Sequence, residues 1–137
     1  MDALSKNHRS WNMAQIRSKD TKPELVVRRL LFKLGARFRL HRKDLPGCPD
    51  IVLPRRRLVI FVNGCFWHRH AGCKLAYSPK SNASTWKAKF KTNVRRDRLA
   101  IAQLHEQHWR VSVIWECQTR NPDELTEFLS SVLEDHQ

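Results

Sequence analysis

Apolar residues along this chain recur first with helical spacing and then with strand spacing, and the two patterns alternate to the end. Helical spacing extends over residues 23–35, 84–108 and 121–133, and a shorter pattern of the same kind covers residues 10–17. Pro23 suits a first helical turn and Gly35 suits the end of a helix, whereas Ser84 and Asn121 suit helix starts. We therefore predict four helices, preceded by a flexible segment at about residues 1–9.

Four segments between these helices have the composition of β-strands. Residues 37–41 alternate basic with apolar side chains, which predicts a strand with one solvent-exposed face. His41 lies on that face. A short apolar run at residues 51–53 precedes a predicted turn, and the longer runs at residues 58–62 and 109–115 are typical of strands buried on both faces. The order of elements predicts one α/β domain, residues 1–137, in which helices flank a mixed central sheet.

Length and charge narrow the class of protein. The chain has 137 residues, of which 41% are hydrophobic, enough for one domain with a real core. No apolar stretch approaches the ~20 residues of a membrane span, and residues 1–6 lack the apolar core of a signal peptide, so we expect a cytoplasmic protein without membrane contact. The 26 Lys and Arg against 13 Asp and Glu give a formal net charge of +13, which favours a nucleic-acid partner.

Three of the four cysteines have the spacing of a metal site. Cys65, His70 and Cys73 lie close together in a predicted loop at residues 64–81, which is too long for a compact domain unless something holds it. Cys117 follows the last predicted strand. If the two long strands are neighbours, Cys117 reaches the other three residues and completes a tetrahedral zinc site of structural type. Buried thiols without a metal are the alternative.

Two large aromatic residues lie inside this run of ligands. Phe66 and Trp67 are adjacent in the loop, and adjacent loop side chains seldom both face inward. In so basic a chain, exposed rings predict stacking on nucleobases. His68 is not needed by the metal and is therefore available for acid–base chemistry.

Asp50 is the first candidate for hydrolytic chemistry. It follows a proline and precedes two predicted strands, which is the skeleton of the PD-(D/E)xK nuclease core, where acids on adjacent strands hold magnesium at the scissile phosphate. The pattern is degenerate, because residues 58–67 contain no acid and the first lysine after the strand is Lys74. Magnesium would then be held by Asp50, a carbonyl near Val62, phosphate and water, with His68 as the nearest group able to activate water.

Several motifs in register resemble a known family. They are NM at residues 12–13, DTKPE at 20–24, LPGCPDIV at 45–52, FVNGCFWHRH at 61–70, NVRRD at 93–97 and WEC at 115–117. Together they resemble the very-short-patch repair (Vsr) DNA mismatch endonucleases, which are restriction-endonuclease-like enzymes. The matches fall in order from about residue 9 to residue 120, so the resemblance covers nearly the whole chain.

The resemblance implies an activity and a substrate. The family nicks one strand of double-stranded DNA on the 5′ side of the thymine in a T·G mismatch, which arises when 5-methylcytosine deaminates, and thereby starts very-short-patch repair. The implied cofactors are catalytic magnesium and structural zinc. The implied protein is a monomer that acts at the bacterial nucleoid, and mismatch-repair proteins are compatible partners.

The same resemblance implies roles for individual residues in catalysis and metal binding. Magnesium is placed on Asp50 and the Val62 carbonyl, and His68 becomes the general base. Asp97 would orient this histidine, and Glu24 would hold metal-bound water. The implied zinc ligands agree with the spacing argument and are Cys65, His70, Cys73 and Cys117.

Contacts with DNA are implied as well. A wedge inserted beside the mismatch would consist of Phe66, Trp67 and Trp86, and Met13 would enter from the other groove. A mismatched pair costs least to unstack, so the wedge contributes selectivity. Further DNA contacts are expected from Lys87, Lys91, Asn93 and Arg95.

One position departs from the family pattern. The family usually has a histidine where this chain has Asn63, and asparagine can hydrogen-bond but cannot exchange protons near neutral pH. Two alternatives therefore stay open. Beside a mismatch endonuclease, these are a catalytically weakened or binding-only DNA-binding protein with a zinc-stapled loop, and a related nuclease with another DNA substrate. Asp50 before a buried strand and His68 beside the zinc loop favour catalysis.

Overall fold

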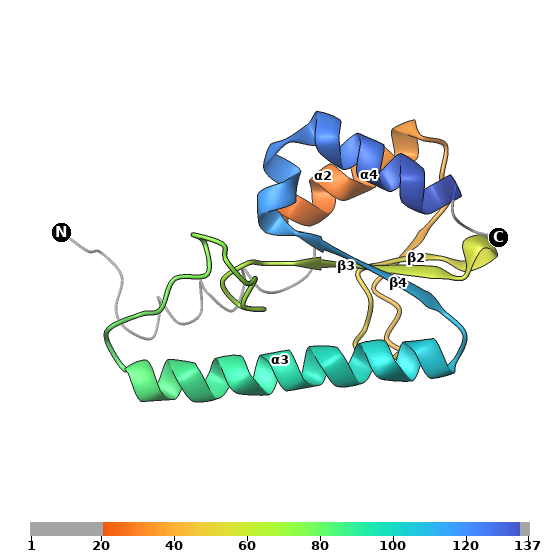
Figure 1. Cartoon of the computed structure of the whole chain (residues 1–137). Helices are drawn as coiled ribbons and strands as arrows, with labels where there is room; N and C mark the ends of the chain where they lie inside the picture. The colour runs from red at the N-terminus through yellow and green to blue at the C-terminus, as the bar shows by residue number, and fades with distance from the viewer. Residues whose placement is uncertain (1–20, 135–137) are drawn as a thin grey trace.

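The computed structural model describes residues 21–134 (Figure 1). Its elements follow in the order α2 (Lys22–Lys33), β1 (Arg39–Leu40), β2 (Ile51–Leu53), the 3-10 turn η1 (Pro54–Arg56), β3 (Leu58–Asn63), α3 (Ala83–Glu106), β4 (Arg110–Trp115), the 3-10 turn η2 (Glu116–Arg120) and α4 (Pro122–Glu134). The helix predicted at residues 10–17, with Met13, lies outside the described residues. The three other predicted helices and the four predicted strands are present, which confirms the mixed α/β architecture.

The four strands form one mixed sheet in the order β1-β2-β3-β4. β2 is antiparallel to both β1 and β3, whereas β4 runs parallel to β3, with Asn63 opposite Trp115. A parallel pair needs a long crossover connection, which the loop after β3 and helix α3 provide. Helices α2 and α4 lie together on one face of the sheet, and α3 lies on the other (Figure 1). The carboxyl ends of β3 and β4 therefore meet at the same edge of the sheet.

Most of the hydrophobic core lies between the sheet and the pair of helices α2 and α4. The core residues include Val27 and Leu31 of α2, Ile60 and Ile114 of the sheet, and Leu129 of α4, all with no exposed surface. Burying one such side chain stabilises the fold by ~1.5–3 kcal/mol. This packing fixes β3, whose carboxyl end carries the candidate site.

The predicted ends of the helices agree with the structure at α2 and α4 but not at α3. Thr21 caps α2, since its Oγ1 accepts a hydrogen bond from the Glu24 N–H at 3.4 Å, and Asn121 Oδ1 accepts one from the Glu124 N–H at 3.3 Å. The N-cap predicted at Ser84 is wrong. The N-cap lies two residues earlier, at Asn82, so that α3 begins at Ala83, and no side chain caps this end.

Two predictions of burial are wrong. The strand β4 is not buried on both faces, because it lies at an edge of the sheet and only Ile114 of its residues is buried. Leu99 belongs to the apolar pattern at residues 84–108, which predicts an inward-facing side chain, yet it is 57% exposed and the neighbouring Ala100 is buried instead. The helix α3 also extends well beyond the sheet (Figure 1), so the sheet covers only part of it. None of the described helices is long and apolar enough to cross a membrane.

Candidate functional site

The carboxyl end of β3 opens into a cleft between α2 and α3, with a volume of about 830 Å³. The residues that line it include all six for which the sequence predicts catalysis or magnesium binding, namely Glu24, Asp50, Val62, Asn63, His68 and Asp97. These residues are scattered over more than half of the chain, and the fold brings them to one place. The chemical roles predicted for them stay predictions.

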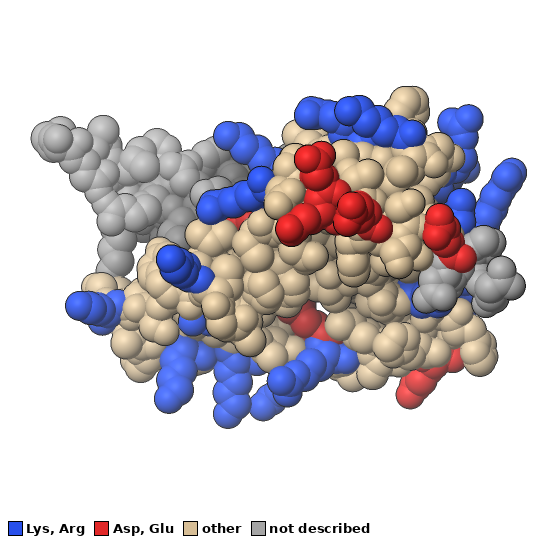
Figure 2. All heavy atoms as spheres, turned by 45° about the horizontal axis from the view of Figure 1, so that its top comes forward, with Lys and Arg blue, Asp and Glu red and all other residues tan. Residues whose placement is uncertain are grey.

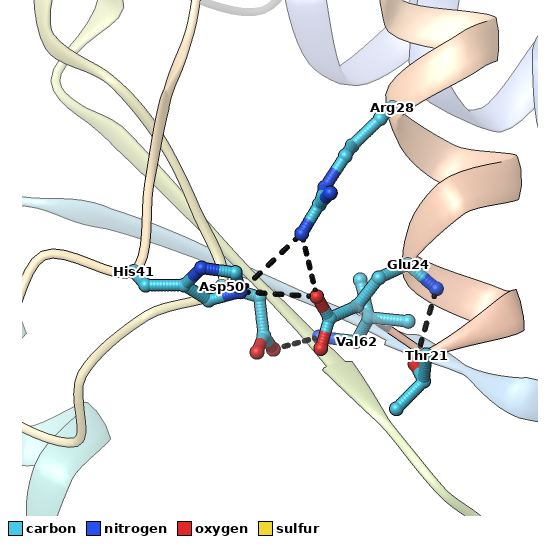
Figure 3. Close-up of polar contacts among 6 residues, drawn as sticks. All are labelled: Thr21, Glu24, Arg28, His41, Asp50 and Val62. Carbon is cyan, nitrogen blue, oxygen red and sulfur yellow. Dashed lines mark hydrogen bonds and ion pairs between the residues drawn. The ribbon is translucent and has the colours of Figure 1, made fainter. Parts of the chain in front are cut away.

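On the α2 side of the cleft, the side chains of Glu24, His41 and Asp50 point toward one another (Figure 3). We call these three residues the acid cluster. One potential ligand atom from each lies within 4.8 Å of the other two. Glu24 Oε2 lies 3.1 Å from His41 Nε2 and accepts a hydrogen bond from Arg28 at 2.9 Å. The cluster therefore combines two carboxyl groups, one imidazole and a neighbouring guanidinium.

His41 is the member of the acid cluster that the sequence analysis missed. The alternating pattern predicted His41 on the solvent-exposed face of a strand. Instead, β1 ends at Leu40, and His41 adopts a left-handed conformation with φ +47°. The side chain is in fact only 17% exposed, and the His41 N–H still donates to the Asp50 carbonyl at 3.1 Å. No local sequence signal marks a histidine for this backbone conformation, which is uncommon for residues other than glycine.

The electrostatic setting of Asp50 suits a ligand of a cation. The pKa of Asp50 is raised to about 7, chiefly by burial and also by the neighbouring Glu24. The Val62 N–H acts in the other direction by donating to Asp50 Oδ2 at 2.7 Å. A divalent cation at the acid cluster would stabilise the ionised form of Asp50.

His68 and Asp97 form a hydrogen-bonded pair on the α3 side of the cleft. His68 Nδ1 lies 2.6 Å from Asp97 Oδ2, and both side chains are about one-third exposed. His68 belongs to the turn after β3, and Asp97 belongs to α3. A carboxylate partner fixes the tautomer of a neutral histidine with its proton on Nδ1, which leaves Nε2 able to accept a proton.

The four predicted zinc ligands, Cys65, His70, Cys73 and Cys117, form a second group, which we call the thiol cluster. Their ligand atoms all lie within 4.8 Å of one another. His70 Nδ1 is 3.6 Å from Cys65 Sγ and 3.5 Å from Cys117 Sγ. Zinc bond lengths of ~2.3 Å to sulfur and ~2.0 Å to nitrogen predict a separation of about 3.6 Å between these atoms in a tetrahedral site. The geometry therefore fits a tetrahedral metal, and zinc as its identity stays a prediction.

Contacts around the thiol cluster orient its ligands. The Trp115 ring stacks on His70 at a centroid distance of 4.2 Å, and Glu116 Oε1 accepts a hydrogen bond from the Cys65 N–H at 3.2 Å. Burial raises the pKa of the Cys65 thiol to about 12, so this thiol keeps its proton until a cation displaces it. The parallel pairing of β3 with β4 confirms the predicted neighbourhood that brings Cys117 to the other three residues.

Comparison with known proteins places the chain in a family. The model of the family described as DNA mismatch endonuclease Vsr matches residues 1–74. This chain is 50% identical to the "Type II nicking enzyme V.XorIIP" of Xanthomonas oryzae pv. oryzae over 133 residues, which is 97% of each chain. The chain belongs to the Vsr family. It is also 42% identical to the "DNA mismatch endonuclease Vsr" of Escherichia coli K12, over 92% of this chain and 80% of that one. This Vsr protein is accordingly a DNA endonuclease, and thus a hydrolase.

Aromatic side chains of the Vsr endonuclease gather beside the cleft. The ring of Phe66 contacts four others at centroid distances of 4.9–5.5 Å, and this aromatic cluster consists of Phe66, Trp67, Tyr77, Trp86 and Phe90. Trp67 is only 7% exposed, so the expectation that the adjacent rings face solvent is wrong for Trp67, which the cluster shields. Phe66 and Trp67 do line the cleft. Their insertion into DNA stays a prediction.

The predicted DNA contacts on α3 divide into two groups. Lys87, Lys91 and Arg95 are exposed, and Figure 2 shows basic side chains along the lower edge of the molecule, where α3 lies. Asn93 is instead 7% exposed, donates to the Trp67 carbonyl at 3.2 Å and accepts a hydrogen bond from Arg96 at 2.6 Å. Asn93 thus holds the loop around Trp67 against α3, because both its amide nitrogen and its amide oxygen are hydrogen-bonded within the protein.

Proposed function

We propose that this Vsr endonuclease nicks one strand of double-stranded DNA on the 5′ side of the thymine in a T·G mismatch, by magnesium-dependent hydrolysis. The observation that carries the proposal is the composition of the cleft, which is lined both by Glu24 and Asp50 of the acid cluster and by the His68–Asp97 pair. Metal-dependent hydrolysis of a phosphodiester can use both kinds of group, since one holds a divalent cation and the other moves a proton.

The donor atoms of the cleft suit magnesium. Carboxylate and carbonyl oxygens are the ligands that magnesium prefers, and Asp50 and the Val62 carbonyl would hold it, with Glu24 beside them. The raised pKa of Asp50 supports a cation at this position, because burial leaves its negative charge poorly compensated. When bound, magnesium stabilises the charge that develops on the phosphate and makes water easier to deprotonate.

His68 is proposed as the general base. Because Asp97 holds Nδ1, the neutral ring can take a proton from the attacking water on Nε2, and Asp97 stabilises the imidazolium that results. Asn63 lies at the same edge of the sheet and is 8% exposed. Its amide can position a group in the cleft by hydrogen bonding but cannot transfer a proton.

Selection of the mismatch is assigned to the aromatic cluster, and positioning of the duplex is assigned to the exposed basic residues of α3. The proposed wedge is formed by Phe66, Trp67 and Trp86. Inserting it costs a few kcal/mol of unstacking, and this cost is lowest at a mismatched pair. Exposed basic residues on α3 would neutralise phosphates and so position the duplex without reading its sequence.

We propose that the metal of the thiol cluster is zinc and that its role is structural. Three thiols and an imidazole are a typical set of zinc ligands, and four protein ligands leave no open position for substrate. The metal would hold both ends of the run from Cys65 to His70, and that run carries Phe66, Trp67 and His68.

A nicking assay on paired duplexes tests the proposed function. Two duplexes differ at one position, T·G in one and C·G in the other, and each is incubated with the zinc-loaded full chain and magnesium. We expect a single nick 5′ to the thymine of the T·G duplex and none in the C·G duplex. Binding of the T·G duplex without a nick would overturn the catalytic proposal, and equal nicking of both duplexes would overturn the mismatch specificity.

Asn63 offers a test of the proton-transfer chemistry. We expect Asn63→His to nick the T·G duplex about tenfold faster, because an imidazole at this edge can exchange protons near neutral pH. The measurement is the single-turnover rate at saturating protein, with Asn63→Gln as the control that enlarges the side chain without adding a titratable group. A rate that rises equally in both variants would contradict the explanation.

A further inference from the structure

We infer that His41 supplies a nitrogen ligand to the cation in the cleft, so that this site favours manganese over magnesium more strongly than an all-oxygen site does. The inference rests on the proposed function, because it concerns the cation that Asp50 would hold. It adds His41 to the ligands of that cation, and as a consequence it predicts a preference among divalent metal ions.

The first support is the geometry of the acid cluster. Glu24, His41 and Asp50 come from α2, from the turn after β1 and from the residue before β2, and their potential ligand atoms still lie within 4.8 Å of one another. Figure 3 shows the imidazole and the two carboxyl groups directed into one space. The Glu24 side chain is 3% exposed and that of His41 is 17% exposed, so the arrangement is held inside the protein.

The second support is the balance of charge. Glu24 and Asp50 place two carboxyl groups in a partly buried space, with the guanidinium of Arg28 2.9 Å from Glu24 Oε2. Carboxyl groups gathered away from water need positive partners or protons. A divalent cation among the three members of the acid cluster would be such a positive partner for both carboxyl groups.

The third support is the hydrogen bonding of His41. An Nη atom of Arg28 lies 3.3 Å from His41 Nε2, and a guanidinium can only donate. This contact fits a neutral imidazole with its lone pair on Nε2, which is the form that binds a metal. The competing role is that Nε2 carries the proton and donates to Glu24 Oε2, 3.1 Å away, which would make His41 a positioning residue for Glu24.

The metal preference follows from the type of donor atom. Imidazole nitrogen raises the affinity for transition-metal ions, whereas magnesium binds oxygen ligands almost exclusively. A site made of the Asp50 carboxylate, the His41 imidazole and the Val62 carbonyl therefore gains affinity for manganese through its nitrogen ligand, and magnesium does not share this gain. The glutamine variant His41→Gln removes the nitrogen ligand but keeps an N–H donor that can reach Glu24.

The experiment measures manganese bound to the zinc-loaded full chain in the absence of DNA. Electron paramagnetic resonance gives the affinity for manganese, competition gives the affinity for magnesium, and pulsed measurements detect a histidine nitrogen bound to the manganese. Manganese does not displace zinc from the thiol cluster, because thiolates bind zinc and because manganese has the lowest affinity in the series of divalent transition-metal ions. In His41→Gln we expect the manganese affinity to fall about tenfold, the magnesium affinity to fall less than about threefold, and the nitrogen signal to disappear. His105→Gln, at an exposed histidine near the end of α3, is the matched control.

Three different results would each overturn a different part of the inference. Equal losses of manganese and magnesium affinity in His41→Gln would make His41 a positioning residue. A nitrogen signal that survives in His41→Gln and disappears in His68→Gln would assign the ligand to His68 instead. Asp50→Asn protein that binds both ions as well as the unaltered protein would overturn the proposed cation site itself.

Discussion

The molecule contains two clusters with potential metal ligands, and they differ in how the sequence encodes them. The thiol cluster takes three of its four ligands from one short loop, whereas the acid cluster takes each member from a different segment. The acid cluster adjoins the cleft, and among the described residues that line the cleft there is no ligand of the thiol cluster. We therefore propose that the thiol cluster acts as a structural support, whereas the acid cluster holds its cation next to the cleft.

The two clusters are connected through the end of one strand. Val62 lies at the cleft and Cys65 lies in the thiol cluster, only three residues further along the chain. A metal that fixes Cys65 therefore limits the motion of the residues that face the cleft. The predictions below separate the two clusters by changing one at a time, in order of decreasing effect.

The largest effect is expected from Cys117→Ser, which removes a ligand of the thiol cluster. We expect zinc content to fall close to zero, the melting temperature to fall by more than about 10 °C, and nicking to be lost, because structural zinc contributes folding free energy directly. Metal analysis and calorimetry measure the change. Cys48→Ser, at an exposed cysteine outside the cluster, should keep its zinc and its melting temperature. A Cys117→Ser protein that retains zinc would contradict the four-ligand site.

Asp50→Asn should abolish function while leaving the scaffold unchanged. We expect the nicking rate on the T·G duplex to fall by at least about a thousandfold, since the variant loses the charged ligand of the cation. Zinc content should remain that of the unaltered protein. Asp123→Asn, at an exposed acid in the first turn of α4, is the control and should nick normally. Retained cleavage by Asp50→Asn would refute the assignment of the cation site.

Asp97→Asn should have a smaller effect, because it acts through His68. We expect the nicking rate to fall about a hundredfold, as the amide no longer stabilises the imidazolium. The fold should be little affected, since both side chains are about one-third exposed. The rate measured across pH distinguishes a lost proton-transfer partner from a folding defect, because only the former moves the pH dependence. An unchanged rate would remove Asp97 from the mechanism.

The smallest effect concerns the stability of the magnesium-free protein. The pKa of Asp50 is about 7 in the fold against an ordinary value of 3.8, so the fold favours the protonated form and loses stability as pH rises from about 3.8 to about 7, where the loss levels off. Asp50→Asn cannot ionise and escapes this loss. Its melting temperature relative to the unaltered protein should therefore be higher at pH 8 than at pH 6, by a few degrees. Magnesium should reduce the difference at pH 8, and a difference that does not change with pH would contradict the raised pKa.

The contrast between the clusters also explains what the sequence could predict. Cys65, His70 and Cys73 are close in the chain, so their spacing alone indicated a metal site, and hydrophobic periodicity indicated the strands that bring Cys117 to them. His41 could not be found in this way. Its position depends on a single left-handed residue after a two-residue strand, and no periodic pattern encodes that.

Burial was the other property that local pattern predicted poorly. The run at residues 109–115 has the apolar composition of a central strand, yet β4 is an edge strand because no fifth strand lies beyond it among the described residues. Trp67 lies in a loop and is buried because rings from α3 cover it. In both cases the deciding neighbours are remote in sequence.

The parallel pairing of β3 with β4 has a consequence for synthesis of the protein. A chain growing from the ribosome exposes Cys65, His70 and Cys73 well before Cys117 is made. The fourth ligand reaches the others only when β4 has paired with β3, and by then α3, with Asp97, has also been made. Closure of the thiol cluster therefore marks a finished sheet, and a chain that ends before Cys117 lacks the fourth ligand although Asp97 has already been made.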